Sequence, residues 1–282
     1  MIKIKKSAII IIIHAVLLFF LFLTLYPLIF TILTSLKNNE QFFTRFWNLP
    51  NPWLYQNYID AVTVILPYLG NSIIISVSSI VIILLTTSLS AYAFARLRFP
   101  AQEAIFMALL ALLMIPAMLQ LIPRYLILRD LRLLAPIGIR PYIGITLGYI
   151  SGQQAFSIFI IRAFFESQPE ELFEAARIDG CNEFSAYFRI ALPLIKPVLA
   201  TVTIITLLTI WNDYLWPLIV ITDPKYFTIA LGLLRYRTGL GTTILYGPLF
   251  AGYVVAALPL MILYIMLMKY FLQGLTSGAI KM

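Results

Sequence analysis

The chain has 282 residues, of which 61% are hydrophobic and only 11% are charged, and its formal net charge is +8. A soluble protein of this length carries roughly a quarter charged residues. Because the apolar residues also form runs long enough to cross a bilayer, the composition excludes a soluble globular protein and indicates an all-α, polytopic membrane protein. Basic residues of such a chain typically set its orientation in the membrane and bind anionic lipid headgroups, so we expect no nucleic-acid partner.

Two residue counts and one missing motif exclude several kinds of chemistry. Cys181 is the single cysteine and His14 the single histidine, so the chain lacks the residues for an internal disulfide, a zinc site or a haem site. No Walker A loop occurs in the sequence. We therefore expect no catalytic residue, no metal and no cofactor, and we expect a partner to hydrolyse any ATP that the protein uses.

The hydrophobic pattern predicts six membrane spans in a single domain over residues 1–282. The first span, at about residues 8–33, follows a cluster of lysines and is too long for a signal peptide. Residues 34–68 contain charges and prolines among aromatic residues, which predicts an extramembrane loop near the headgroups. The other five spans are expected at about residues 71–95, 104–122, 142–165, 198–221 and 248–272.

The orientation of the chain follows only weakly from its charges. Six spans place both termini on the same side, and the lysines Lys3, Lys5 and Lys6 favour the inside for the N-terminus. With this orientation, Lys and Arg are almost evenly divided between the two sides. The main exception to the positive-inside rule is the segment Arg124–Arg140, which has four arginines and would lie outside.

The fourth predicted span carries a row of glycines at four-residue spacing, Gly144, Gly148 and Gly152. This spacing places them on one face of a helix. Small residues let another segment approach closely inside a membrane, where apolar burial gives no advantage over lipid. We expect this face to be a helix-packing surface.

The fifth predicted span ends in the sequence Trp211-Asn212-Asp213-Tyr214. An ionisable group at this depth is costly and should face a cavity, the protein interior or the membrane interface. Asn212 and Asp213 are candidates for the translocation path, and a position at the interface beside tryptophan is an equally good interpretation. A lone acid makes a poor proton relay, which counts against an ion-coupled secondary transporter.

The loop between the fourth and fifth spans, residues 166–197, contains a predicted amphipathic helix. Pro169 suits the first turn of a helix, the acids after it suit the positive end of the helix dipole, and Gly180 is a natural C-terminal stop. Half of the twelve acidic residues of the chain lie in this loop: Glu166, Glu170, Glu171, Glu174, Asp179 and Glu183. Such a concentration of charge is typical of a docking surface for another protein.

The same loop carries a family resemblance. The string Glu174-Ala175-Ala176-Arg177-Ile178-Asp179-Gly180, followed by Leu192-Pro193 and Pro197, resembles the EAA loop of the membrane subunits of bacterial ATP-binding-cassette importers. Further stretches resemble the second permease subunit of maltose-type sugar importers, and together they cover nearly the whole chain: Ser35-Leu36-Lys37, Asn71-Ser72, Ala91 to Arg96, Trp211-Asn212-Asp213 and Gly274 to Lys281.

The resemblance implies a fold, a place in the cell and a set of partners. The fold is that of a type I importer permease with six transmembrane helices and a cytoplasmic coupling helix, in the bacterial inner membrane with both termini in the cytoplasm. The partners are a second homologous permease, two copies of a cytoplasmic ATP-binding subunit, and an extracellular or periplasmic solute-binding protein. The resemblance assigns ATPase coupling to Glu174, Ala175, Ala176, Asp179 and Gly180. The chain itself is then a non-catalytic subunit.

The implied function is uptake of a carbohydrate by alternating access, and the expected kind of carbohydrate is an oligosaccharide. An ion-coupled secondary transporter or a six-span channel is the alternative, although the sequence has no evident inverted repeat and lacks the paired Asn-Pro-Ala motifs of an aquaporin-type pore. A membrane-embedded enzyme is disfavoured because one His, one Cys and one intramembrane Asp do not form a catalytic set. The particular sugar does not follow from the sequence.

Overall fold

The computed structural model describes residues 6–135, 138–239 and 244–279, with side chains at positions 9–135, 138–236 and 244–269. The described residues form helices and no strand, which confirms the predicted all-α class. Lys3, Lys5 and the last residues of the tail, positions 280–282, lie outside the described residues. The chain divides into two compact units: Met1–Leu66 with Leu233–Leu258, and Pro67–Gly232 with Pro259–Met282. The expectation of a single domain over residues 1–282 stays a prediction.

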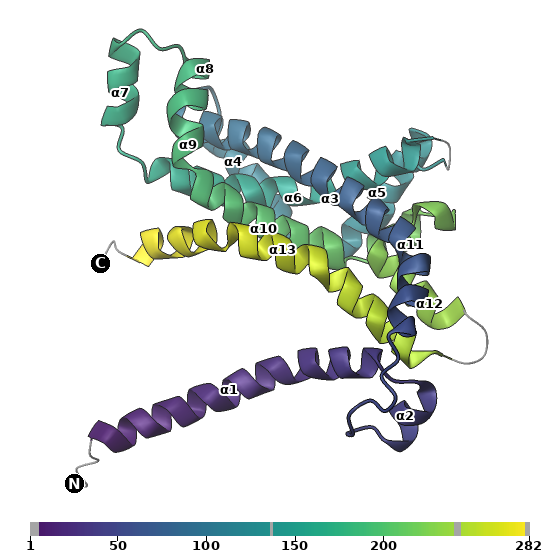
Figure 1. Cartoon of the computed structure of the whole chain (residues 1–282). Coiled ribbons are helices and arrows are strands. Elements are labelled where there is room, and N and C mark those ends of the chain that lie inside the picture. Colours follow the sequence, from purple (N-terminus) through teal and green to yellow (C-terminus); the bar gives the residue numbers. More distant parts are fainter. Residues whose placement is uncertain (1–5, 136–137, 240–243, 280–282) are drawn as a thin grey trace. The chain divides into compact units, whose positions relative to one another are not determined.

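The helices are labelled in Figure 1. The long ones are α1 (Lys6–Ser35), α3 (Gln56–Arg96), α6 (Arg140–Glu166), α10 (Lys196–Asn212) and α13 (Tyr246–Ala279). The intermediate ones are α4 (Gln102–Ala111), α5 (Ala117–Asp130), α7 (Glu171–Ile178) and α12 (Ile229–Gly239). The short ones are α2 (Asn39–Thr44), α8 (Glu183–Ala186), α9 (Leu192–Leu194), α11 (Leu215–Val220), the 3₁₀ turns η1 (Leu112–Met114) and η3 (Pro224–Tyr226), and the π-helical turn η2 (Tyr187–Ala191).

Within the described residues, four helices are long and apolar enough to span a membrane: α1, α3, α6 and α13. The number rises to the predicted six when each of two bent pairs counts as one span. One pair is α4 with η1 and α5, bent by 104°, and the other joins the segment Glu183–Leu194 to α10, bent by 72°.

Two predicted spans were wrong in their continuity. The span 104–122 is broken at Ile115, whose backbone is extended (φ −79°, ψ 117°) because the following Pro116 disfavours helical geometry before it. The span 198–221 ends early, since α10 stops at Asn212 and Asp213 is extended. The Asp213 carboxylate accepts hydrogen bonds from the backbone N–H of Leu215 and Trp216, at 2.9 and 3.3 Å, and so begins α11 in place of a further turn of α10.

The helix that contains the second predicted span, 71–95, begins before it, and the loop expected over 34–68 is partly helical. α3 begins at Gln56 and continues through Pro67, which was expected to break it. A proline inside a helix costs about 3 kcal/mol. The helix before Pro67 is closely packed: Ala61 and Ile65 on the first turns of α3 are completely buried.

The first unit is held together by amide and aromatic side chains. The Asn57 amide donates to the carbonyls of Ser35 and Lys37, and the Asn39 side chain binds the backbone at Ile244 and Tyr246. The rings of Phe42 and Tyr246 stack with centroids 4.2 Å apart. By contrast, the part of α1 from Ile9 to Ile29 is exposed along its whole length, as expected of a helix that contacts lipid or another subunit.

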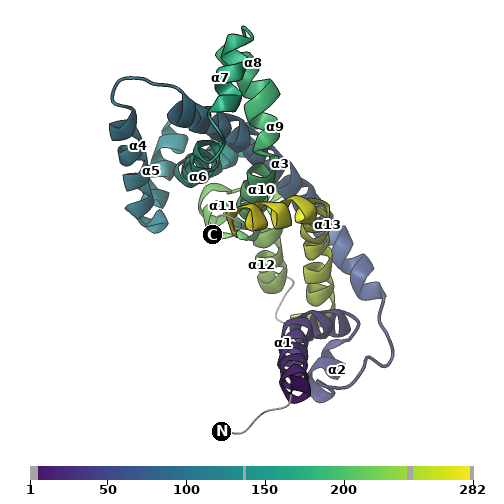
Figure 2. The ribbon, with the colours of Figure 1, turned by 90° about the vertical axis from the view of Figure 1, so that its left-hand side faces the viewer.

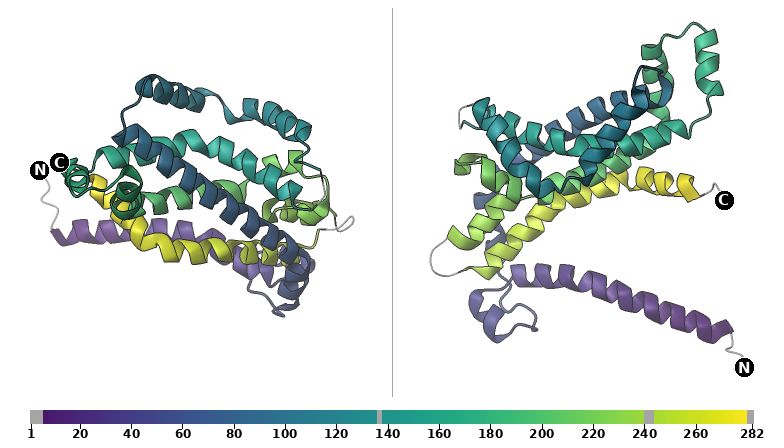
Figure 3. Two further views of the ribbon diagram at one scale, coloured as in Figure 1. Left: turned by 90° about the horizontal axis from the view of Figure 1, so that it is seen from above. Right: turned by 180° about the vertical axis from the view of Figure 1, so that it is seen from behind.

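The second unit contains α6 and α10 side by side, with α4 and α5 beside α6 (Figures 2 and 3). At one end of this unit α7 and α8 lie next to each other, away from α11 (Figure 1). Asn71 and Ser72 on α3 bind the segment before α12: the Asn71 amide donates to the carbonyls of Lys225 and Phe227, and the Ser72 hydroxyl accepts from the N–H of Ile229.

Candidate functional site

The helix predicted in the loop 166–197 is present as α7, Glu171–Ile178. Pro169 precedes the helix instead of lying in its first turn, and Glu171 and Glu174 occupy that turn, where the helix dipole favours acids. At the other end, Gly180 has a φ of +80°. The N–H of Gly180 donates to the carbonyl of Arg177 and the N–H of Cys181 to that of Ala176, the two bonds of a Schellman motif. Glycine is needed here because this backbone geometry is left-handed.

The two faces of α7 differ in what they contact. Phe173 and Ala176 are buried against the second unit, with 1% and 5% of their surface exposed. Glu174 and Ala175 lie on the other face and are exposed, and Ile178 on that face is 86% exposed. Of the five residues assigned to ATPase coupling, Glu174, Ala175, Asp179 and Gly180 are exposed, whereas Ala176 faces inward.

The six acids of this loop fall into two groups. Glu166 pairs with Arg162 at 2.6 Å, and Glu183 pairs with Arg177 at 3.2 Å and accepts a hydrogen bond from the Tyr92 hydroxyl at 2.8 Å. The remaining four make no ion pair with any residue that the structure describes: Glu170, Glu171, Glu174 and Asp179. The negative charge available to another protein is therefore concentrated on α7 and its two ends.

Arg96, the last residue of α3, binds the backbone at the start of this loop. Its guanidinium donates to the carbonyls of Phe165 and Gln168, at 2.6 and 2.8 Å, and lies 4.2 Å above the centre of the Phe173 ring. The hydrogen bonds are charge-assisted and the ring contact is a cation–π interaction. No sequence signal assigns Arg96 a role of its own, although it ends the string Ala91 to Arg96 that carries the resemblance.

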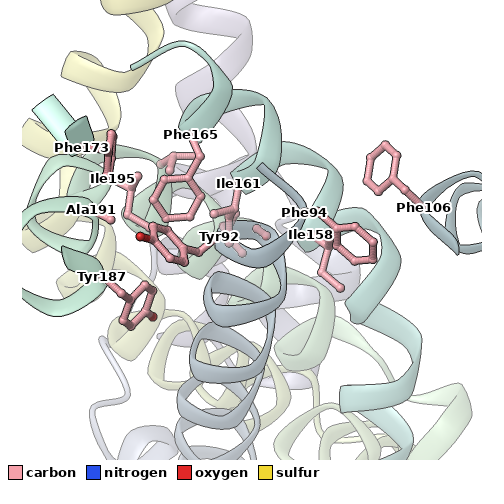
Figure 4. Packing of buried hydrophobic residues seen from close by; sticks show 13 residues of the cluster. Tyr92, Phe94, Phe106, Ile158, Ile161, Phe165, Phe173, Tyr187, Ala191 and Ile195 are labelled. Carbon is pink, nitrogen blue, oxygen red and sulfur yellow. The ribbon is translucent and has the colours of Figure 1, made fainter. Parts of the chain in front are cut away.

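An aromatic cluster lies beneath α7 and connects it to α3. The Tyr92 ring packs against those of Phe165 and Tyr187, with centroids 5.7 and 5.4 Å apart (Figure 4). The Tyr187 hydroxyl in turn shares a hydrogen bond of 2.7 Å with Ser88 on α3. A displacement of α7 therefore acts directly on the end of α3, as well as through the chain connections to α6 and α10.

The glycine face of α6 lies against three different groups. A Cβ atom on Gly144 would lie 2.6 Å from the carbonyl oxygen of Leu133, and one on Gly148 would lie 2.5 Å from the Trp216 indole. At Gly152 it would lie 3.3 Å from the guanidinium of Arg124. The small residues thus allow close approach by a loop carbonyl, an aromatic ring and an arginine.

A cavity of about 480 Å³ opens beside this face, between α5, α6 and the end of α10. Its polar lining comes from Gln120, Arg124, Tyr149, Gln153, Thr209 and Asp213. The two candidate path residues are separated: Asp213 lines the cavity, whereas Asn212 is exposed and its amide donates to the carbonyl of Leu208 at 2.9 Å. Arg124 and Tyr149 are polar groups of this site that our sequence analysis did not select.

Comparison with known proteins gives consistent relatives. The family described as "Binding-protein-dependent transport system inner membrane component" matches residues 84–277. The probable ABC transporter permease protein YurM of Bacillus subtilis is 34% identical over 93% of this chain and 87% of its own length. The arabinooligosaccharides transport system permease protein AraQ of Halalkalibacterium halodurans is 34% identical over 93% of each chain. A chain of a bacterial ABC transporter involved in the import of the acidic polysaccharide alginate is 26% identical, with a TM-score of 0.82 over 96% of this chain and 100% of its own.

Proposed function

The chain belongs to the family of binding-protein-dependent transport system inner membrane components, and on this premise we propose that it is a permease subunit of an ATP-driven carbohydrate importer. As a member of this family it is a multi-pass inner-membrane protein that works with a solute-binding protein, and it is a transport component and not an enzyme. Family membership also sets aside the ion-coupled secondary transporter and the six-span channel.

The observation that carries the proposal is the form of the loop at α7, within the matched residues 84–277. A short helix ends in a fixed Schellman turn, is buried on one side, and presents four unpaired acids around its exposed side. Such a helix suits a cleft lined by basic side chains on another protein. We assign that cleft to a cytoplasmic ATP-binding subunit, present in two copies, one for this chain and one for a second homologous permease.

In the proposed mechanism, ATP binding closes the pair of ATP-binding subunits and draws the two coupling helices together. Glu174, Ala175, Asp179 and Gly180 make the contact, and Ala176 packs beneath it. The movement of α7 passes to α3 through Phe173 and Arg96, and shifts the paired permeases between inward-open and outward-open states. Asp213 lies on the path that opens and closes, while Asn212 supports the end of α10 beside it.

The proposed substrate is a carbohydrate, and more specifically an oligosaccharide. Its support is the substrate named for relatives, such as the arabinooligosaccharides of the AraQ protein and the diacetylchitobiose of the NgcG protein of Streptomyces coelicolor. These relatives cover at least 93% of this chain, so the similarity includes the cavity beside Asp213 as well as the loop at α7.

The test is purification from the membranes of the native host with an affinity tag on this chain. We expect a second permease and an ATP-binding subunit to co-purify. After reconstitution into vesicles with the solute-binding protein, uptake of a labelled oligosaccharide should require ATP and should be insensitive to ionophores. Uptake that continues without ATP and stops when the ion gradient is dissipated would contradict the proposal.

We further propose that the loop at α7 and both termini lie in the cytoplasm. Cys181, the only cysteine, is partly exposed directly after the coupling helix and reports on this orientation. A membrane-impermeant maleimide should label Cys181 in inside-out vesicles and leave it unlabelled in intact spheroplasts. A Cys181→Ser variant provides the background control, and labelling from the outside alone would reverse the assigned orientation.

A further inference from the structure

The cavity beside Asp213 has the size and composition of a small-molecule site. Its volume of about 480 Å³ is within the range of roughly 300–1,000 Å³ that such sites occupy. The walls are mainly apolar, from residues such as Leu112, Leu121 and Trp216, and a few polar groups converge on the space from three helices. This combination is typical of a binding site and differs from a packing defect, which is apolar throughout.

Tyr149 provides a buried polar group that has the Asp213 carboxylate beside it. Its side chain is 6% exposed, its hydroxyl lines the cavity, and that hydroxyl makes no hydrogen bond of good geometry with any residue that the structure describes. The carboxylate of Asp213 lies beside it. Buried hydroxyl groups are nearly always hydrogen-bonded, so a hydroxyl that lines a cavity without a well-aligned bond is suited to pair with a ligand there.

The two charged groups of the cavity are also partly free. One oxygen of Asp213 accepts from the backbone N–H groups of Leu215 and Trp216, and the carboxylate also interacts with the Tyr149 hydroxyl beside it, which leaves acceptor capacity on its second oxygen. Arg124 donates to Gln120 at 3.0 Å and lies flat against Gly152, and the planar guanidinium retains further donors. Arg124 and Asp213 interact electrostatically, so the lining holds one cation and one anion and no net charge.

We propose that this cavity binds one unit of an uncharged saccharide, and that the carboxylate of Asp213 in its lining excludes acidic saccharides. Neighbouring sugar hydroxyls donate to the second oxygen of Asp213 and accept from Arg124, and the Tyr149 hydroxyl completes the set. A uronic acid would place its carboxylate beside Asp213, and repulsion between like charges is strong where water is scarce. This inference rests on the proposed function, since it names the class of saccharide that the importer carries.

The test measures binding to the complete importer in lipid nanodiscs, without the solute-binding protein, by equilibrium dialysis. The probes are arabinotriose, raffinose and diacetylchitobiose as neutral saccharides and digalacturonic acid as the acidic one. The wild type should bind at least one neutral probe and should bind digalacturonic acid at least tenfold more weakly. Tyr149→Phe should lower the affinity for the neutral probe about tenfold, which corresponds to the loss of one hydrogen bond of about 1.4 kcal/mol. Asp213→Asn should reduce the difference in binding affinity between the neutral probes and digalacturonic acid.

Tyr142→Phe is the matched control, because it removes a hydroxyl from the same helix that already bonds to Asn71 at 2.7 Å. It should leave probe binding unchanged. The thermal midpoint separates a binding role from a structural one: Tyr149→Phe should lower the midpoint less than Tyr142→Phe does, since the Tyr149 hydroxyl makes no well-aligned hydrogen bond within the described residues whereas the Tyr142 hydroxyl does.

Equal binding of neutral and acidic probes, an unchanged affinity in Tyr149→Phe, or no binding of any neutral probe would each overturn the inference. ATP-driven uptake in vesicles of the same preparation keeps the two proposals apart. If oligosaccharide uptake persists while the cavity variants have no effect, only the saccharide site is refuted. If no saccharide is taken up with ATP, the proposed function itself is refuted.

Discussion

Replacing Glu174 with lysine is expected to abolish transport while membrane insertion continues. Glu174 is exposed on the outward face of α7 and has no ion-pair partner among the described residues, so its charge is available to the ATP-binding subunit. A lysine would oppose the basic side chain that we propose there, and like charges across an interface cost several kcal/mol. We expect the ATP-binding subunit to be lost on purification and uptake to fall at least a hundredfold.

The control for this variant is Glu170→Lys. Glu170 is the N-cap residue of the same helix, so the change disturbs the helix dipole by a similar amount, about 0.3–1 kcal/mol. Glu170 is itself one of the four exposed acids, so we expect Glu170→Lys to reduce transport, but much less than Glu174→Lys does. Glu174→Gln, which removes the charge without reversing it, should lie between the two. Full uptake by Glu174→Lys, with normal amounts of the ATP-binding subunit bound, would refute the coupling role.

The second large effect is expected at Gly148, where an alanine should destabilise the second unit. The new Cβ would lie 2.5 Å from the Trp216 indole, a bulky ring that is 2% exposed, so the ring or the helix must shift. Overpacking of this kind typically costs about 1–3 kcal/mol. The thermal midpoint of the purified protein in detergent should fall by several degrees. Because Trp216 also lines the cavity, saccharide binding should weaken together with stability.

Gly70→Ala is the matched control for Gly148→Ala. Gly70 lies in α3, and a Cβ atom built on it meets nothing within 4 Å. The same substitution there should be neutral or slightly stabilising, since alanine is the better helix former by about 1 kcal/mol. Gly152→Ala should have a small effect on stability, because it meets only the mobile end of Arg124 at 3.3 Å. Equal thermal midpoints for Gly148→Ala and Gly70→Ala would contradict the packing argument.

The helix at the coupling loop was predictable because its signals are local. Acids suit the first turn of α7, and Gly180 suits the left-handed residue after its last turn, so neighbouring residues alone specify the element. The breaks in the predicted spans were harder to predict from the sequence. Pro116 carries a sequence signal for a break, yet prolines also occur inside continuous helices here, as Pro67 does in α3. Whether a proline interrupts a helix depends on the packing that offsets its cost, and that packing is not local.

The sequence by itself determined that the protein lies in a membrane, that its fold is all-α, and which loop carries the expected docking surface for a partner. Apolar runs of bilayer length and a single acidic loop are properties of composition and of spacing along the chain, and these require no knowledge of contacts. Which acids remain free became visible in the structure, where Arg162 and Arg177 pair with Glu166 and Glu183 close by in the chain. Only the tertiary structure placed Tyr92 of α3 against Glu183 as well. It also brought Arg124, Tyr149 and Asp213 from α5, α6 and the end of α10 to one cavity. The lining of the cavity depends on distances between residues far apart in the chain, which only the packing of the helices fixes.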